Sequence, residues 1–214
     1  MMELEALLAA RQDPAALAET LAPGDIPYLV GLLEEKNNDI RYAAFLTLQK
    51  RSMAHADVYP FWDALAQKLD HENSYQRSIG VMLLSENVRW DTSDRLDAIL
   101  PRYMACFRDE KFITARQAIQ SLQSWLPQRP DLYPAIVEEL TDIHVDQLPP
   151  TQRKLILLDI VNALLSIQET APMDDAAVYI VRALDGGLLT KKEKDAVRKR
   201  MGSGVADGMA RMVR

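Results

Sequence analysis

The chain has 214 residues and a hydrophobic fraction of 48%, which can supply a packed core and excludes overall disorder. Its formal net charge of −6 argues against an extended nucleic-acid footprint, because phosphate binding over the whole surface needs Lys and Arg in excess. The single cysteine, Cys106, excludes an intramolecular disulfide, favours a reducing compartment and is expected to be a small buried side chain on a helix.

The N-terminal stretch MMELEALLAARQD has no basic start and no long apolar run, which argues against a secretory signal. The longest apolar segment, residues 155–167, is too short to span a bilayer and contains Asp159 and Asn162. The eight glycines are few, and leucine and alanine outnumber the β-branched residues. We therefore expect an all-α, soluble and cytoplasmic protein without a membrane span.

Four expected first helices each begin near a proline, at Pro27, Pro60, Pro101 and Pro134. Proline suits the first turn of a helix, where its missing N–H would have no partner anyway. Pro101 could instead bend a helix that begins earlier, near Arg95.

Four expected second helices begin just before an arginine, at Arg41, Arg77, Arg116 and Arg153. Three positions after each arginine stands an apolar or small residue, at Ala44, Gly80, Ile119 and Ile156. This spacing is the periodicity of one helix face, so the chain is predicted to form a series of helical hairpins. Thr114 and Gln117 fit a capping box for the third of these helices, and TKKE at 190–193 fits another for a late helix.

An acid precedes each of these arginines by seven positions, at Glu34, Asp70, Asp109 and Asp146. Successive arginines lie 36, 39 and 37 positions apart, so the acid and the arginine recur with a structural repeat. A catalytic site would need only one such acid–arginine pair, and the chain has four, which favours a structural role for the pairs. A single hairpin cannot bury its apolar face alone, so the repeat indicates a right-handed α-solenoid of stacked hairpins.

Units of this length, with a proline in the first helix, an acid at the turn and an arginine opening the second helix, resemble the HEAT/armadillo class. The resemblance covers about residues 24–167 and implies that the four acids and four arginines form a ladder between successive repeats. We expect one α-solenoid domain over residues 1–214. It would comprise four HEAT-like units in 24–167, a further helix pair in 168–201 and a flexible basic tail in 202–214.

Three central stretches, residues 72–80, 86–91 and 109–119, are similar to a narrower family of small bacterial HEAT-like proteins labelled SufBD. The matched residues are Asn73, Ser74, Tyr75, Arg77, Gly80, Trp90, Asp91, Asp109, Glu110, Lys111, Ile113, Thr114, Ala115, Arg116 and Gln117. The chain departs from the family pattern by having Ile79, Phe112 and Ala118 where an arginine, a proline and a cysteine are usual. The label hints at iron–sulfur assembly, but one cysteine does not supply the ligands of a cluster, and we expect no cofactor.

No catalytic or metal-binding constellation is expected from the sequence, because the three histidines are scattered and none pairs at the spacing of a helical metal site. The enzymatic alternative is a HEAT-like DNA alkyl-purine glycosylase, in which Trp90, Asp91 and Trp125 would lie near the lesion. The charge distribution argues against it, since residues 1–190 hold 17 basic and 28 acidic side chains.

The interpretation that remains is a non-catalytic protein-interaction or scaffold module, with its partner on the second helices of the three central units. Candidate contact residues are Ser74, Tyr75, Trp90, Asp91, Lys111 and Gln117. The alternative for these residues is capping and turn formation. An acidic body favours a protein or peptide segment with basic character as partner.

The last part of the chain differs in charge from the rest. Residues 191–214 hold eight basic and three acidic side chains. This segment is interpreted as a solvated surface helix near the acidic body, with a nucleic-acid or membrane-surface contact as the alternative.

Overall fold

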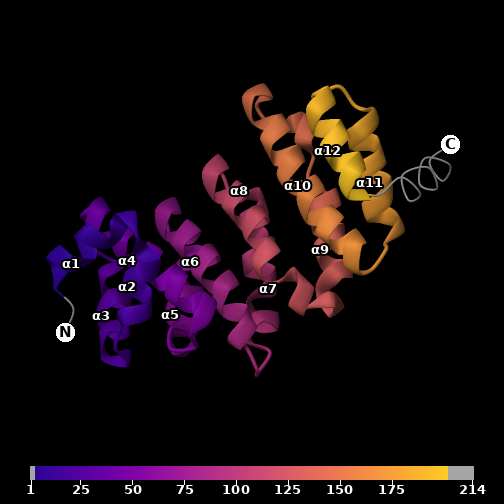
Figure 1. Ribbon diagram of the computed structural model, residues 1–214. Coiled ribbons are helices and arrows are strands. Elements are labelled where there is room, and N and C mark those ends of the chain that lie inside the picture. The colour runs from indigo at the N-terminus through magenta and orange to yellow at the C-terminus, as the bar shows by residue number, and fades with distance from the viewer. Residues whose placement is uncertain (1–2, 202–214) are drawn as a thin grey trace. The chain divides into compact units, whose positions relative to one another are not determined.

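A computed structural model describes residues 3–201 of the chain, and every regular element in this range is helical (Figure 1). The prediction of an all-α protein is therefore confirmed. The chain divides into two compact units, Met1–Cys106 (unit 1) and Phe107–Arg214 (unit 2). The predicted basic tail, residues 202–214, lies outside the described residues.

Unit 1 is built from α-helices and short 3-10 turns. Its α-helices are α1 (Leu4–Ala9), α2 (Pro14–Thr20), α3 (Ile26–Leu32), α4 (Asn38–Ala54), α5 (Trp62–Gln67), α6 (Ser74–Asn87) and α7 (Arg95–Ala105). The long helix α4 packs against α1, α2 and α3 on one side and against α6 on the other, and α6 packs against α5. Leu29, Leu48, Trp62, Leu65 and Leu83 are each 1% exposed or less, so the core lies between the members of each hairpin and between neighbouring hairpins.

Asparagine side chains set the starts of α4 and α6. Asn37 Oδ1 accepts from the backbone N–H groups of Asp39 and Ile40, at 2.9 and 3.4 Å. Asn73 Oδ1 accepts from the Tyr75 N–H at 3.0 Å. Both asparagines are N-caps, which satisfy donors that the first turn of a helix leaves free. Each precedes the arginine of its helix by four positions, so the cap recurs with the repeat.

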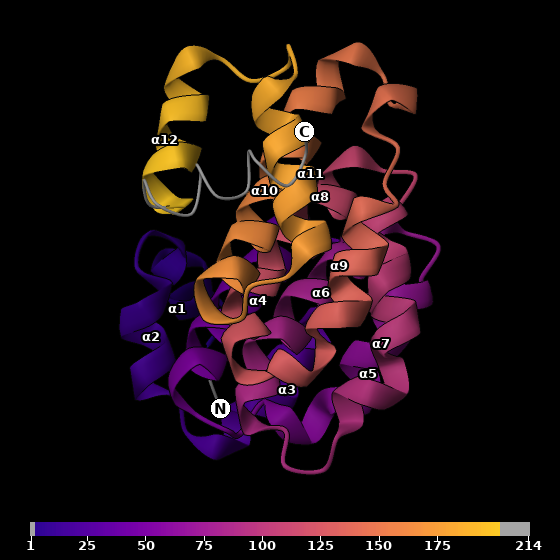
Figure 2. The same cartoon turned by 90° about the vertical axis from the view of Figure 1, so that its right-hand side faces the viewer.

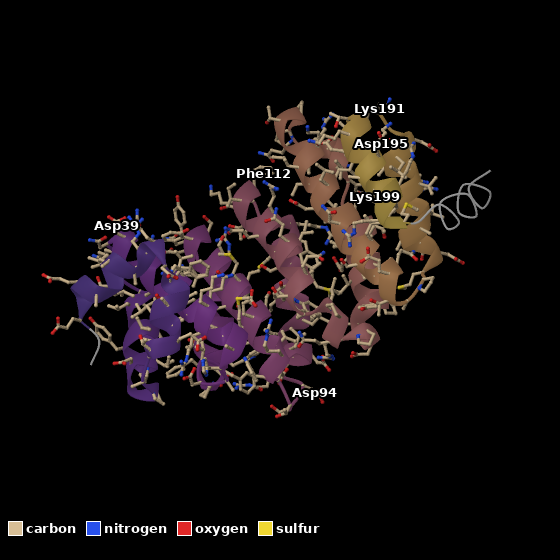
Figure 3. The ribbon with its side chains drawn as sticks, viewed as in Figure 1. Asp39, Asp94, Phe112, Lys191, Asp195 and Lys199 are labelled. Atoms are coloured by element: carbon tan, nitrogen blue, oxygen red, sulfur yellow. The ribbon has the colours of Figure 1, made fainter. Side chains whose placement is uncertain are left out.

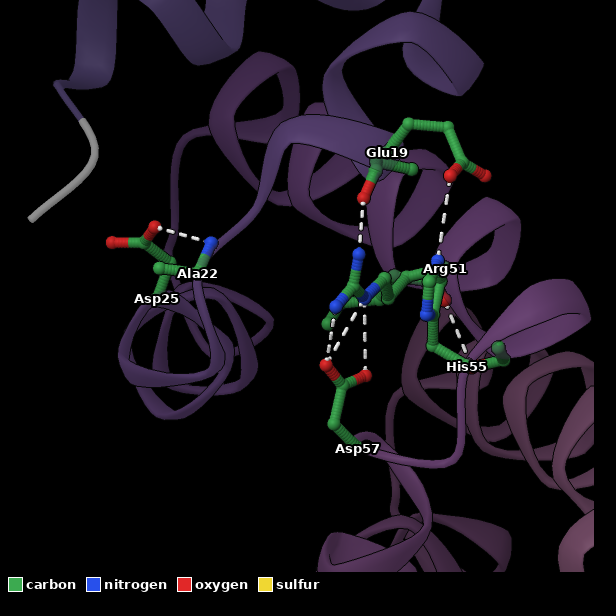
Figure 4. A network of polar contacts seen from close by, with 9 residues as sticks. Glu19, Ala22, Asp25, Arg51, His55 and Asp57 are labelled. Carbon is green, nitrogen blue, oxygen red and sulfur yellow. Dashed lines mark hydrogen bonds and ion pairs between the residues drawn. The ribbon is translucent and has the colours of Figure 1, made fainter.

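A buried arginine ties the end of α4 to α2. Arg51 is 6% exposed, and its guanidinium donates to both carboxylate oxygens of Asp57, with an Nη2–Oδ2 distance of 2.7 Å (Figure 4). Its Nη1 donates to the Ala18 carbonyl at 2.9 Å. The bidentate pair and the carbonyl together satisfy a charge that burial would otherwise penalise.

The helices α5 and α6 approach each other most closely at Gly80. A Cβ built on Gly80 would lie 2.8 Å from the Lys68 Cβ and 3.0 Å from the Leu65 carbonyl oxygen. Lys68, in the 3-10 turn that extends α5, is itself 5% exposed and donates from Nζ to Gln76 Oε1 at 2.6 Å. Gly80 is thus required because the backbone of one helix lies against the side-chain base of the other.

Unit 2 contains α8 (Phe112–Ser121), α9 (Tyr133–Thr141), α10 (Pro150–Thr170), α11 (Asp174–Asp185) and α12 (Lys191–Met201). The long helix α10 packs against α8, α9, α11 and α12, and α9 also packs against α11. The arrangement of α10 beside α11 and α12 can be followed in Figures 1 and 2. Trp125, Ile136, Leu140, Ile160 and Leu164 are fully buried and form the centre of this unit.

Two local predictions have different outcomes in the structure. Pro101 lies inside α7, so the alternative in which it belongs to a helix that starts near Arg95 is correct. The capping box at Thr114 is wrong, because α8 begins at Phe112 and Thr114 is a buried residue of its first turn. The capping box at Thr190 is confirmed by reciprocal hydrogen bonds with Glu193.

Among the helices of residues 3–201, none combines the length and the apolar character that crossing a membrane requires.

Candidate protein-binding surface

The repeated arginines hold the turns of their own hairpins. Arg41 Nη1 donates to the Glu35 carbonyl at 2.9 Å, and Arg153 Nε donates to the Leu148 carbonyl at 2.7 Å. Arg77 Nη1 donates to the carbonyls of His71 and Glu72, at 2.8 and 3.0 Å. An arginine in the first turn of the second helix can thus reach carbonyls five or six positions earlier, which explains why its position recurs.

Two of the repeated acids form ion pairs with bases of the next first helix. Glu34 pairs with Lys68, and Asp70 pairs with Arg102 of α7. Asp109 Oδ1 accepts from the Lys111 N–H at 2.8 Å, in the turn before α8. Asp146 is exposed in a 3-10 turn, Val145–Gln147.

Arg116 is paired within unit 2. It donates to Asp159 of α10, from Nε at 2.6 Å and from Nη2 at 3.2 Å. Gln120 adds a hydrogen bond to the same carboxylate at 2.9 Å. The ladder between the four acids and the four arginines stays a prediction.

Trp90 and Asp91 fix the junction between α6 and α7. The Trp90 indole N–H donates to the Ser52 carbonyl at 2.7 Å, and the Tyr59 hydroxyl donates to Asp91 Oδ1 at 2.7 Å. Asp91 Oδ2 also accepts from the Leu96 N–H at 2.9 Å. These contacts agree with the alternative role of Trp90 and Asp91 in capping and turn formation, because the indole N–H and the carboxylate already have partners within the protein.

Asp91 stabilises the start of α7 in place of the N-cap residue of that helix, Asp94. Asp94, labelled in Figure 3, has φ 55° and makes no capping hydrogen bond. Partial burial alone would raise the pKa of Asp91, but hydrogen bonds from the Leu96 N–H and the Tyr59 hydroxyl outweigh it and lower this pKa below its usual value of 3.8.

Asp91→Asn is expected to lower the free energy of unfolding by about 1 kcal/mol at pH 7, as the loss of a charged helix cap does. Since the folded-state pKa is depressed, this contribution is fully present above the ordinary carboxyl pKa and is lost as the pH falls through the folded-state value. Urea denaturation between pH 7 and 3 should show the difference from wild type shrinking below about pH 4. Asp94→Asn is the control without effect, and a difference for Asp91→Asn that is independent of pH would contradict the assignment.

Three more of the residues named from the sequence lie in unit 2, whereas Ser74 and Tyr75 are the first two residues of α6 in unit 1. Lys111 is exposed directly before α8, with Nζ 3.7 Å from Glu110. Gln117 is partly buried, and within the described residues its Oε1 has no hydrogen-bond partner. Trp125, named for the glycosylase alternative, is fully buried and has no face for a nucleic-acid base.

The most exposed aromatic side chains of unit 1 lie near the starts of α4 and α6, with Tyr42 one position after Arg41 and Tyr75 two positions before Arg77. Tyr42 is 50% exposed and Tyr75 is 68% exposed, each in the first or second turn of its helix. The guanidinium carbon of Arg11 lies 5.7 Å from the Tyr42 ring centroid, and that of Arg41 lies 5.8 Å from the Tyr75 ring centroid. We call Arg11, Arg41, Tyr42 and Tyr75 the tyrosine–arginine surface.

Both arginines of this surface are held in place. Arg11 pairs with Asp39, labelled in Figure 3, at 2.7 Å. Arg41 spans from α4 to the Tyr75 ring of α6 while its Nη2 donates to Asn38 Oδ1 at 2.5 Å. Guanidinium groups over aromatic faces restrict the tyrosine rings, so the surface loses little conformational freedom when a partner binds.

Unpaired carboxylates lie in the turns just before the two helices. Glu35 and Glu72 are exposed, and neither side chain forms an ion pair with another residue in 3–201. Two aromatic rings, each beside a guanidinium group, and two nearby carboxylates are therefore open to solvent at this end of α4 and α6.

The sequence motifs predict Ser74 and Tyr75 as contact residues but give no indication of Tyr42 and Arg11. The available signal was the arginine repeat, since Tyr42 directly follows Arg41. A tyrosine in a first turn looks the same in sequence whether it is buried or exposed, so this signal was not sufficient.

The described residues contain no group of three or more His, Cys, Asp or Glu side chains arranged to hold a metal ion. No protein-family model and no curated protein matches this sequence.

Proposed function

We propose that the protein is a non-catalytic protein-binding module, built as an α-solenoid of stacked hairpins, and that a partner binds the tyrosine–arginine surface. The packing within each unit supports the solenoid, because second helices lie beside second helices (α4 and α6, α8 and α10) and α9 lies beside α11. Stacking of this kind places the ends of the second helices in a row.

The observation that carries the proposal is the exposure of Tyr42 and Tyr75 beside fixed arginines. Tyrosine and arginine dominate the binding energy of protein interfaces, because both combine a large contact area with hydrogen-bonding groups. Because half or more of each tyrosine side chain is exposed, the two rings contribute little to folding through burial, whereas a partner that covers them gains from their burial.

The charges around the surface indicate the partner's chemistry. Asp39 neutralises Arg11, and Glu35 and Glu72 supply two further negative charges beside Arg41. A segment that brings an apolar or aromatic residue for the rings together with Lys or Arg for the carboxylates fits both parts. Complementary charge of this kind mainly accelerates association and excludes acidic competitors.

Tyr75→Ala is expected to weaken partner binding at least about tenfold, as truncation of an interface hot spot does. A photo-crosslinking aromatic residue at position 75 first identifies the partner in extract of the source cells, and titration of the purified pair then measures the affinity. Met53→Ala is the matched control, because Met53 is 45% exposed at the opposite end of α4. It should change the affinity less than about twofold.

Equal losses for the two variants would refute the surface assignment, as would crosslinks that are as abundant from position 53 as from position 75. Glu72→Lys tests the basic character of the partner separately. It should slow association more at low salt than at high salt, and an unchanged rate would remove that part of the proposal.

A further inference from the structure

The basic helix α12 is fastened to unit 2 along one side. Val197 is 5% exposed on the side that packs on α10, and Arg200 pairs with Glu169 at 2.9 Å. Glu193 lies 3.3 Å from Lys154 of α10, and Lys194 Nζ donates to the Gly186 carbonyl at 2.8 Å. These contacts hold the helix in one orientation, and its opposite side is not covered by any of residues 3–201.

The outward side of α12 carries lysines without partners. Lys191, Lys192 and Lys199 are exposed and make no hydrogen bond or ion pair with any described residue (Figure 3 labels two of them). Lys192 and Lys199 are seven positions apart and therefore lie on one helix face. The acid on this side, Asp195, lies 3.5 Å from Arg198 and between Lys192 and Lys199 on the helix surface, so this single carboxylate compensates only part of the positive charge.

Two of these lysines occupy positions that are unfavourable for the helix itself. Lys191 and Lys192 occupy the first turn, where the helix dipole is positive and an acid would be stabilising. The first-turn N–H groups are served by the capping box of Thr190 and Glu193, so the lysines add nothing to it. Lys191 and Lys192 therefore oppose the dipole, whereas Lys199 stands in the last turn, where a positive charge is favourable, and the three together give a positive side open to an external anion.

We propose that Lys191, Lys192 and Lys199 form a sequence-independent contact with the phosphate backbone of nucleic acid. Lysine ammonium groups bind phosphates as point charges and release condensed counterions. A membrane surface fits less well, because the apolar side of α12, with Val197, is already buried on α10 and no apolar face is left to insert. The contact is confined to one helix, in agreement with an acidic remainder of the chain.

The test is fluorescence anisotropy of the full chain with a labelled duplex DNA of about 30 base pairs at several KCl concentrations. Three lysine–phosphate contacts predict weak binding, with Kd on the order of 10–100 µM at 50 mM salt, and a slope of log affinity against log salt of about −3. Lys199→Gln should reduce this slope by about 1.

Lys192→Glu/Lys199→Glu should weaken binding at least about tenfold. The matched control is Lys36→Glu/Lys50→Glu, which changes the net charge equally at exposed, unpaired lysines of unit 1. Equal losses in the two double variants would overturn the proposal, because binding would then follow net charge alone. Absence of DNA binding by the wild type, or tighter binding to phosphatidylserine vesicles or polyglutamate than to DNA, would overturn it as well.

Discussion

Arg116→Ala is expected to lower the free energy of unfolding by about 3 kcal/mol, as removal of one partner from a buried ion pair does. Asp159 is 7% exposed in its side chain and accepts two hydrogen bonds from the Arg116 guanidinium. Without Arg116, the buried carboxylate loses its charged partner and keeps, among the described residues, the hydrogen bond from Gln120. Urea denaturation at pH 7, followed by circular dichroism, measures the loss.

Arg198→Ala is the control for this variant. Arg198 and Asp195 are 52% and 58% exposed, so their pair is screened by water and its loss should cost less than about 0.5 kcal/mol. Replacing both Arg116 and Asp159 with apolar residues should recover much of the stability, since no charge is then left buried. If Arg116→Ala costs no more than Arg198→Ala, the pair does not stabilise unit 2.

Gly80→Val is expected to destabilise the protein by about 2–3 kcal/mol, the cost typical of overpacking in a well-packed interior. The first added carbon would meet the Lys68 Cβ at 2.8 Å and the Leu65 carbonyl oxygen at 3.0 Å. Neither atom is the mobile end of a side chain, so relief requires α5 and α6 to separate. The change in urea midpoint between wild type and variant measures this cost.

Gly31→Ala is the matched control, because Gly31 lies within α3 and a Cβ there meets nothing within 4 Å. Alanine at position 31 reduces the conformational entropy of the unfolded chain, so Gly31→Ala should stabilise the protein by about 0.5–1 kcal/mol. Opposite signs for the two glycines are therefore expected. A Gly80→Val variant as stable as wild type would mean that the two helices are not held at this spacing.

The spacing of the repeated acid and arginine predicts where helices begin but not which side chains pair. The spacing correctly placed the second helices, because Arg41, Arg77 and Arg153 all lie in first turns. The spacing did not determine the hydrogen-bond and ion-pair partners of these arginines. Arg41 and Arg153 hold turn carbonyls of their own hairpins, and Arg116 pairs with Asp159, which lies 43 positions further along the chain.

For the candidate surface too, the sequence predicts the position of a residue in its helix but not its exposure. The stretch 72–80 predicts Tyr75 as a contact residue, and Tyr75 is exposed, whereas Trp90 and Asp91, predicted from the stretch 86–91 of the same resemblance, hold the junction before α7. Whether an aromatic side chain becomes a 68% exposed ring, as Tyr75 does, or a fully buried one, as Trp125 does, depends on which helix packs beside it.

The sequence by itself determined the helical class, the hairpin order and most helix starts, because capping residues, prolines and the apolar period act within a few positions of one another. Only the tertiary structure decided which charges pair and which rings stay in water. Arg41 stacks on a ring 34 positions away, and Gly80 is required by a residue of the neighbouring helix. Such contacts depend on the packing distance between helices, which no local pattern in the sequence encodes.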